Sequence, residues 1–179
     1  VSQVDDLDAP RELLVDNFSN WGIETRLLTR YDLLNDQSVL LIGAKYYDAN
    51  NDQRQGPGSN ATGPDFSFVD TTYPDYARQA EFNFPNKNLA IFGENIFNIS
   101  ERFSVTPGFR FEYISTASEG SYKNIILDLA GNPLQNETVE DSRDFERSFV
   151  LLGVGSSYSL NPKNELYANI SQNYRSVTF

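Results

Sequence analysis

Hydrophobic and polar residues alternate at every second position in several stretches of the chain, which is the period of a β-strand with one apolar face. The clearest stretch lies between residues 104 and 113. One face of it would hold Val105, Pro107, Phe109, Phe111 and Tyr113, and the other Ser104, Thr106, Gly108, Arg110 and Glu112. A helix would mix these two sets, whereas a strand separates them fully. The pattern therefore predicts a strand here.

Five further strands follow from the same kind of pattern, each about ten residues long or a little longer. They are predicted from Asn17 to about residue 31, over 38–48, 87–99 and 148–160, and from Glu165 onward. Residues 1–15 are expected to form a loop, with a weak helical turn at 11–14. Short turns are predicted near 33–37, 100–102 and 161–164, and long connections at about 49–86 and 115–147, because Gly, Pro, Asn and Asp are frequent there.

The connections therefore alternate between short and long, as in a membrane barrel with short periplasmic turns and long outer loops. A tilted strand of roughly nine to eleven residues crosses a bilayer. The predicted fold class is all-β: an antiparallel meander of about six strands, a partial segment of a large transmembrane β-barrel. One alternative is a soluble secreted β-sandwich that binds carbohydrate or protein through its long loops. Another is a small complete barrel, which would need eight strands, with residues 122–129 supplying one of the two missing.

Composition narrows the possible chemistry. The 179 residues include no His, Cys or Met. A Ser-His-Asp triad, a thiol nucleophile and a Cys/His metal site are therefore excluded. The net charge of -11 argues against a nucleic-acid-binding face. The acidic residues at 137–146 could suggest calcium, but they lack EF-hand spacing, so a solvated charge run is the preferred interpretation.

Other stretches resemble a known family. The segments concerned are Asn17–Arg26 (NFSNWGIETR), Asn95–Tyr113 with its Pro-Gly-x-Arg ending, Leu166–Arg175 (LYANISQNYR) and Ser176–Phe179. They resemble barrel strands of TonB-dependent outer-membrane receptors, and more narrowly those of the ferric-dicitrate-type subgroup. The resemblance extends over nearly the whole chain.

This resemblance implies a barrel of about 22 strands around a plug domain, of which residues 1–179 would supply about six. It implies uptake of a ferric chelate (ferric-citrate or siderophore-like) across the outer membrane of a Gram-negative bacterium, energised by the TonB complex. Neither an enzymatic activity nor a cofactor is expected. Expected partners are the chelate, the plug domain, TonB through an N-terminal region outside this chain, and outer-membrane lipid, but not nucleic acid. Neither Val1 nor Phe179 is expected to be a natural end.

Because ferric citrate is anionic, arginines would complement it through charge-assisted hydrogen bonds. The candidates are Arg54, Gln55 and Arg78 in a predicted outer loop, and Arg110 and Arg175 on predicted strands. The competing interpretation is that such arginines pair with neighbouring carboxylates, as Arg110 would with Glu112. No catalytic or metal-binding residue is predicted.

Overall fold

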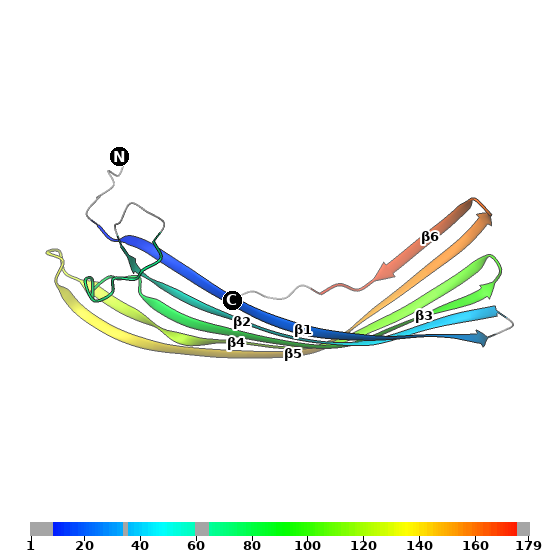
Figure 1. The fold of residues 1–179 in the computed structure, drawn as a ribbon, viewed down its shortest axis with the longest axis horizontal. Coiled ribbons are helices and arrows are strands. Elements are labelled where there is room, and N and C mark those ends of the chain that lie inside the picture. The colour runs from blue at the N-terminus through cyan, green and yellow to red at the C-terminus, as the bar shows by residue number, and fades with distance from the viewer. Residues whose placement is uncertain (1–8, 34–35, 60–64, 175–179) are drawn as a thin grey trace. The chain divides into compact units, whose positions relative to one another are not determined.

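The computed structural model describes residues 9–33, 36–59 and 65–174, which are dominated by β-strands. The strands are β1 (Arg11–Leu33), β2 (Asp36–Gly58), β3 (Ala80–Ser100), β4 (Phe103–Leu127), β5 (Pro133–Asn161) and β6 (Asn164–Ser171). They form one antiparallel sheet in the order β1 to β6, so each strand pairs with its neighbours in sequence (Figure 1). The predicted fold class is confirmed.

The two alternative architectures do not agree with this sheet. A sandwich needs a second sheet, and the described strands form only one. An eight-stranded barrel needs a strand hidden in each long connection, but residues 122–127 continue β4 instead. In the described part of the chain, no helix has the length and apolar character needed to span a bilayer.

The first five strands are longer than predicted, with 21 to 29 residues each. Much of the two long connections expected at 49–86 and 115–147 therefore belongs to strands. Only residues 59–79 and 128–132 of these stretches lie between strands. The loop and helical turn expected in residues 1–15 are also wrong from Arg11 onward, where β1 begins. Those predictions failed because a strand with water on both sides needs no apolar face. Its backbone pairs with the neighbouring strands whatever the polarity of its side chains.

The turn between β4 and β5 shows how little sequence such a connection needs. Asp128 accepts hydrogen bonds from the backbone N–H groups of Ala130 and Asn132, both at 2.8 Å. Gly131 lies between them with a φ of 85°, a conformation that glycine adopts without a Cβ penalty. A compact turn thus occupies the middle of a stretch whose acidic composition predicted a long loop.

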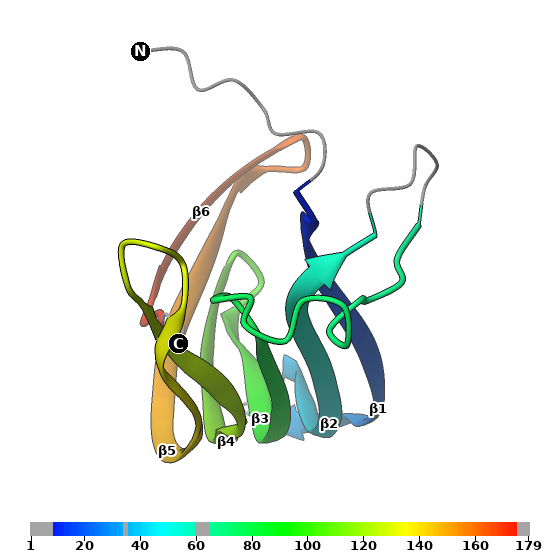
Figure 2. The ribbon, with the colours of Figure 1, turned by 90° about the vertical axis from the view of Figure 1, so that its left-hand side faces the viewer.

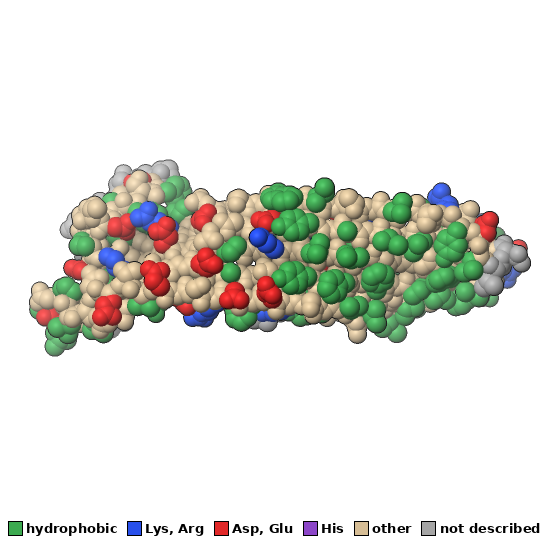
Figure 3. Space-filling model, turned by 90° about the horizontal axis from the view of Figure 1, so that it is seen from below, with side chains coloured by type: hydrophobic (Ala, Val, Ile, Leu, Met, Phe, Trp, Pro, Cys, Tyr) green, Lys and Arg blue, Asp and Glu red, His purple; other side chains and the backbone are tan. Residues whose placement is uncertain are grey.

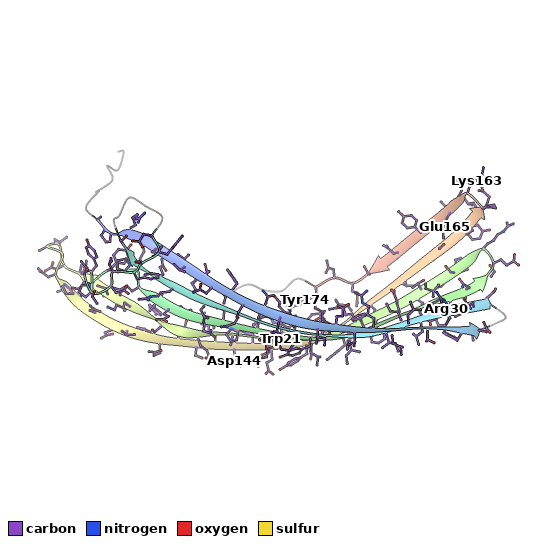
Figure 4. The ribbon with its side chains drawn as sticks, viewed as in Figure 1. Trp21, Arg30, Asp144, Lys163, Glu165 and Tyr174 are labelled. Atoms are coloured by element: carbon purple, nitrogen blue, oxygen red, sulfur yellow. The ribbon has the colours of Figure 1, made fainter. Side chains whose placement is uncertain are left out.

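The chain divides into two compact units, and strands β1 to β5 contribute residues to both. The first unit comprises residues 1–20, 49–86 and 116–145 and contains the connections β2–β3 and β4–β5. The second unit comprises residues 21–48, 87–115 and 146–179 and contains the three short connections. At one of these, Lys163 stands at the tip of the turn and Glu165 follows it on β6 (Figure 4).

In the second unit, large hydrophobic side chains gather on one side of the sheet. Trp21 packs against Tyr46 of the neighbouring strand with ring centroids 5.3 Å apart. The exposed members of this apolar face are Trp21, Ile23, Leu27, Ile42, Leu89, Ile91, Phe109, Val150, Leu152, Val154, Tyr158, Leu166 and Ile170. Figure 3 shows this part of the surface covered by hydrophobic side chains. Because exposed apolar surface costs about 25 cal/mol per Å² in water, a continuous face of this kind requires a lipid or protein covering.

The pairing of β5 with β6 shows how the second unit separates its two faces. Val154 lies opposite Ile170 and Tyr158 opposite Leu166, whereas Gly155 lies opposite Asn169. Neighbouring residues of a strand point to opposite sides. Apolar pairs therefore occupy one face and small or polar pairs the other, as expected for a wall between lipid and water.

We predict that Ile170→Arg destabilises the protein folded into phospholipid vesicles by about 2–4 kcal/mol, the range for Arg facing lipid near the bilayer midplane. The matched control is Asn169→Arg, which places the same charge on the polar face one residue away and should cost much less. Denaturant titration would measure both. Equal destabilisation by the two substitutions would contradict the assignment of the faces.

Candidate functional site

In the first unit, polar side chains of β1 and β2 bond to one another across one face of the sheet. Asp16 accepts hydrogen bonds from the side-chain amides of Asn51 and Gln53, both at 2.9 Å. Glu12, four residues before Asp16 on β1, accepts one from Gln55 at 2.6 Å. Asn51, Gln53 and Gln55 therefore share a face, as residues two apart in a strand must.

The opposite face carries a separate set. Asp52 accepts a hydrogen bond from Asn83 on β3 at 2.6 Å. Arg54 forms an ion pair with Asp70 and lies over the ring of Phe68, 4.3 Å from its centroid. Arg54 and Asp52 also line a hollow of about 410 Å³ whose other acidic members are Glu81, Glu119 and Glu140. Although Arg54 and Gln55 are consecutive, the structure points them to opposite faces.

The β2–β3 connection is held against the other strands of the first unit (Figure 2). Lys123 of β4 donates from its ammonium to the carbonyl of Pro74 at 2.8 Å, and Asn136 of β5 donates to Asp75 at 2.6 Å. Arg78, near the end of this connection, forms an ion pair with Glu12 of β1. The structure thus brings Arg78 and Gln55 together on one carboxylate.

The shared carboxylate is electrostatically altered by this arrangement. Hydrogen bonds from Arg78 and then Gln55 hold the pKa of Glu12 below its ordinary value, because both favour the charged form. The Arg78 side chain is 68% exposed. Glu12 lies in the stretch that sequence reasoning read as a loop. The face of β1 that carries Glu12 and Asp16 also carries Leu14 and Phe18. Because polar and apolar residues mix on this one face, the sequence shows no period of two that would have indicated a strand.

Arg110, a further candidate, belongs to the second unit. It forms an ion pair with Glu112, whose side chain is 12% exposed, and it lies 5.4 Å from the centroid of the Phe92 ring. Arg26 approaches the same ring at 5.9 Å. Arg26, Phe92 and Arg110 line a hollow of about 450 Å³. The last candidate, Arg175, lies outside the described residues.

The described candidates therefore share one property: each arginine among them is neutralised by a carboxylate, as Arg54 is by Asp70, Arg78 by Glu12 and Arg110 by Glu112. Ligand contact by these residues stays a prediction. Within the described ranges, no group of three or more acidic side chains is arranged to hold a metal ion.

Comparison with protein families gives a match over nearly the full length. The family described as TonB dependent receptor-like, beta-barrel matches residues 3–179. The chain belongs to this family. TonB-dependent receptors are transporters of the bacterial outer membrane, so the apolar face of the second unit is the lipid-facing side of a barrel wall. No curated protein matches the chain at a significant level.

We predict that Arg78→Ala raises the pKa of Glu12 toward its ordinary value, because the strongest hydrogen bond to the carboxylate is lost. A lowered carboxyl pKa contributes stability above the ordinary pKa, and that contribution disappears as the pH falls through the native pKa. Carbon-13 titration of the glutamate and aspartate side-chain carboxyls, assigned with Glu12→Gln and Asp16→Asn, would measure the change. The pKa of Asp16, lowered by Asn51 and Gln53, provides the internal control and should not move. An unchanged Glu12 pKa would contradict the ion pair.

Proposed function

We propose that this chain forms part of the wall of a receptor that takes up a ferric chelate, ferric-citrate or siderophore-like, with energy from the TonB complex. We also propose that this chain's partners include the plug domain of the receptor and TonB. Membership of the receptor family supports uptake across the outer membrane. The sequence resemblance to the ferric-dicitrate-type subgroup supports iron as the cargo.

The observation that carries the assignment of a ligand-facing surface is the separation of side chains on β1 and β2. Within the first unit, Gln55 bonds to Glu12 on one face of the sheet, whereas Arg54 lies on the opposite face. We assign the face of Glu12 and Gln55, with Arg78 bonded to Glu12, to the barrel interior, because a barrel interior is polar and this face carries a network of amide–carboxylate hydrogen bonds.

The same reasoning sorts the arginine candidates. Arg54 follows Gln53 and precedes Gln55 on β2, so it lies on the face opposite to theirs, away from the proposed interior side. Arg78 bonds to Glu12 on the proposed interior side, and its side chain is 68% exposed. Because a guanidinium offers five donors in a fixed fork, Arg78 can bond both Glu12 and a ligand oxygen. Arg78 and Gln55 are accordingly our proposed ligand contacts.

The test is iron uptake and binding by the full receptor carrying Arg78→Ala. Loss of one hydrogen bond to a charged group costs about 1.5–3 kcal/mol, so the affinity for a ferric chelate should fall by about tenfold or more. Arg54→Ala is the matched control, since it removes an equivalent ion-paired arginine from the opposite face. It should leave binding within about twofold.

Uptake of radioactive iron as a chelate under iron limitation would test the receptor itself. Saturable, TonB-dependent uptake is the expected result. A receptor that folds, reaches the outer membrane and takes up no ferric chelate would refute the proposed cargo. Sensitivity to Arg54→Ala but not to Arg78→Ala would instead refute the assignment of the ligand-facing side.

A further inference from the structure

Three polar side chains interrupt the lipid-facing side of the second unit near its short turns, and we term them the Tyr–Ser–Asn cluster. They are Tyr31 on β1, Ser38 on β2 and Asn95 on β3, each four residues from a member of the apolar face, namely Leu27, Ile42 and Ile91. An even separation along a strand keeps the side to which a residue points. The three side chains therefore point to the side that lipid covers.

A hydrogen bond crosses the middle strand of this cluster. The Tyr31 hydroxyl donates to Asn95 Oδ1 at 3.0 Å, although β2 lies between β1 and β3 in the sheet. A Cβ added at Gly43 would meet the Thr25 carbonyl, so these two residues lie nearly opposite each other on β2 and β1. Counting five residues from each in opposite directions pairs Ser38 with the neighbour of Tyr31. The bridging tyrosine thus lies over Ser38, which is only 1% exposed.

Two polar groups of the cluster have no hydrogen-bond partner among the residues that the structure describes. They are Ser38 Oγ and Asn95 Nδ2, both buried, and Asn95 as a whole is 8% exposed. An unsatisfied polar group is costly in hydrocarbon, where no water replaces the missing partner. An amide nitrogen only donates, and a hydroxyl can donate one proton. The missing partner must therefore supply hydrogen-bond acceptors.

The cluster lies at the depth of the polar part of a lipid leaflet. Ser38 is two residues from the start of β2 and Tyr31 two residues from the end of β1, which is roughly 7 Å along the strand. The polar region of each leaflet is about 5–8 Å thick, and the short turns of a receptor barrel face the periplasm. The acceptors at this depth are the ester carbonyl oxygens of glycerophospholipids in the periplasmic leaflet.

We propose that the Tyr–Ser–Asn cluster is a binding site for one glycerophospholipid of the periplasmic leaflet. Asn95 Nδ2 and Ser38 Oγ donate hydrogen bonds to the ester carbonyl oxygens of the lipid. Tyr31 is the lid of the site, because its side chain must move off Ser38 for the lipid to reach both donors. The site binds a component of the membrane, so it does not depend on the cargo of the receptor.

Native mass spectrometry of the full receptor in detergent would count the lipids that it retains. The probes are dioleoyl phosphatidylethanolamine and its ether-linked analogue, which has the same headgroup and chain length but no ester carbonyls. We expect one tightly retained ester lipid per receptor and at least about fivefold weaker binding of the ether lipid, because the ether lacks the carbonyl acceptors. Equal retention of the two lipids, or retention of neither, would overturn the proposal.

Variants connect the retained lipid to the cluster. Asn95→Leu, which removes the amide at similar volume, should weaken binding of the ester lipid by about fivefold and leave the ether lipid unchanged. Tyr31→Phe should preserve or strengthen lipid binding, because it releases the lid from Asn95. Asn98→Leu is the matched control, since Asn98 lies three residues further along β3 and points to the opposite side.

Heat-modifiable migration on gels would show that each variant folds. If the cluster only stabilised the sheet, Tyr31→Phe and Asn95→Leu would act alike, because either breaks the same hydrogen bond. That result would overturn the proposal. Unchanged lipid binding in Asn95→Leu would also overturn it, since the buried amide would then be satisfied by water alone. Loss of lipid in the Asn98→Leu control would contradict the location of the site.

Discussion

Backbone hydrogen bonding between neighbouring strands is the constraint on which the rest of this structure depends. In hydrocarbon each unpaired N–H or C=O group costs several kcal/mol, so a chain that crosses lipid as strands must keep its ladder continuous. The pairing of β5 with β6, from Gly153 opposite Ser171 to Asn161 opposite Asn164, is one such ladder. Once the ladder is fixed, pleating alone decides which side chains meet lipid and which meet the interior. Val154 and Gly155 differ in environment only because they are consecutive.

The same alternation has different consequences in the two units. In the second unit it separates an apolar face from a polar one, because lipid tolerates only the former. In the first unit both sides are polar: Asp52 bonds to Asn83 on one side, while Asp16 and Glu12 bond to the amides of β2 on the other. Consecutive residues can therefore serve unrelated surfaces, as Arg54 and Gln55 do. A search for binding residues that treats neighbours in sequence as neighbours in space fails in such a sheet.

Sequence reasoning succeeded where one side of a strand is apolar and failed where neither is. The stretch from Val105 to Tyr113 was predicted correctly because lipid-facing residues enforce a period of two along β4. The solvated halves of β4 and β5 carry no such constraint, and their Gly and acidic content suggested loops. The candidate site was harder still. The pair of Arg78 with Glu12 joins residues 66 positions apart, and only the register of the strands brings them together.

Charge compensation explains why arginine content alone is a poor guide to the ligand. An unpaired guanidinium on an interior wall would attract anions strongly, whereas one already bonded to a carboxylate attracts them less, because the ion pair carries no net charge. The chain's net charge of -11 does not reverse this argument, because fields from distant charges fade over about 8 Å at physiological ionic strength. Contacts at the surface itself must therefore discriminate among chelates.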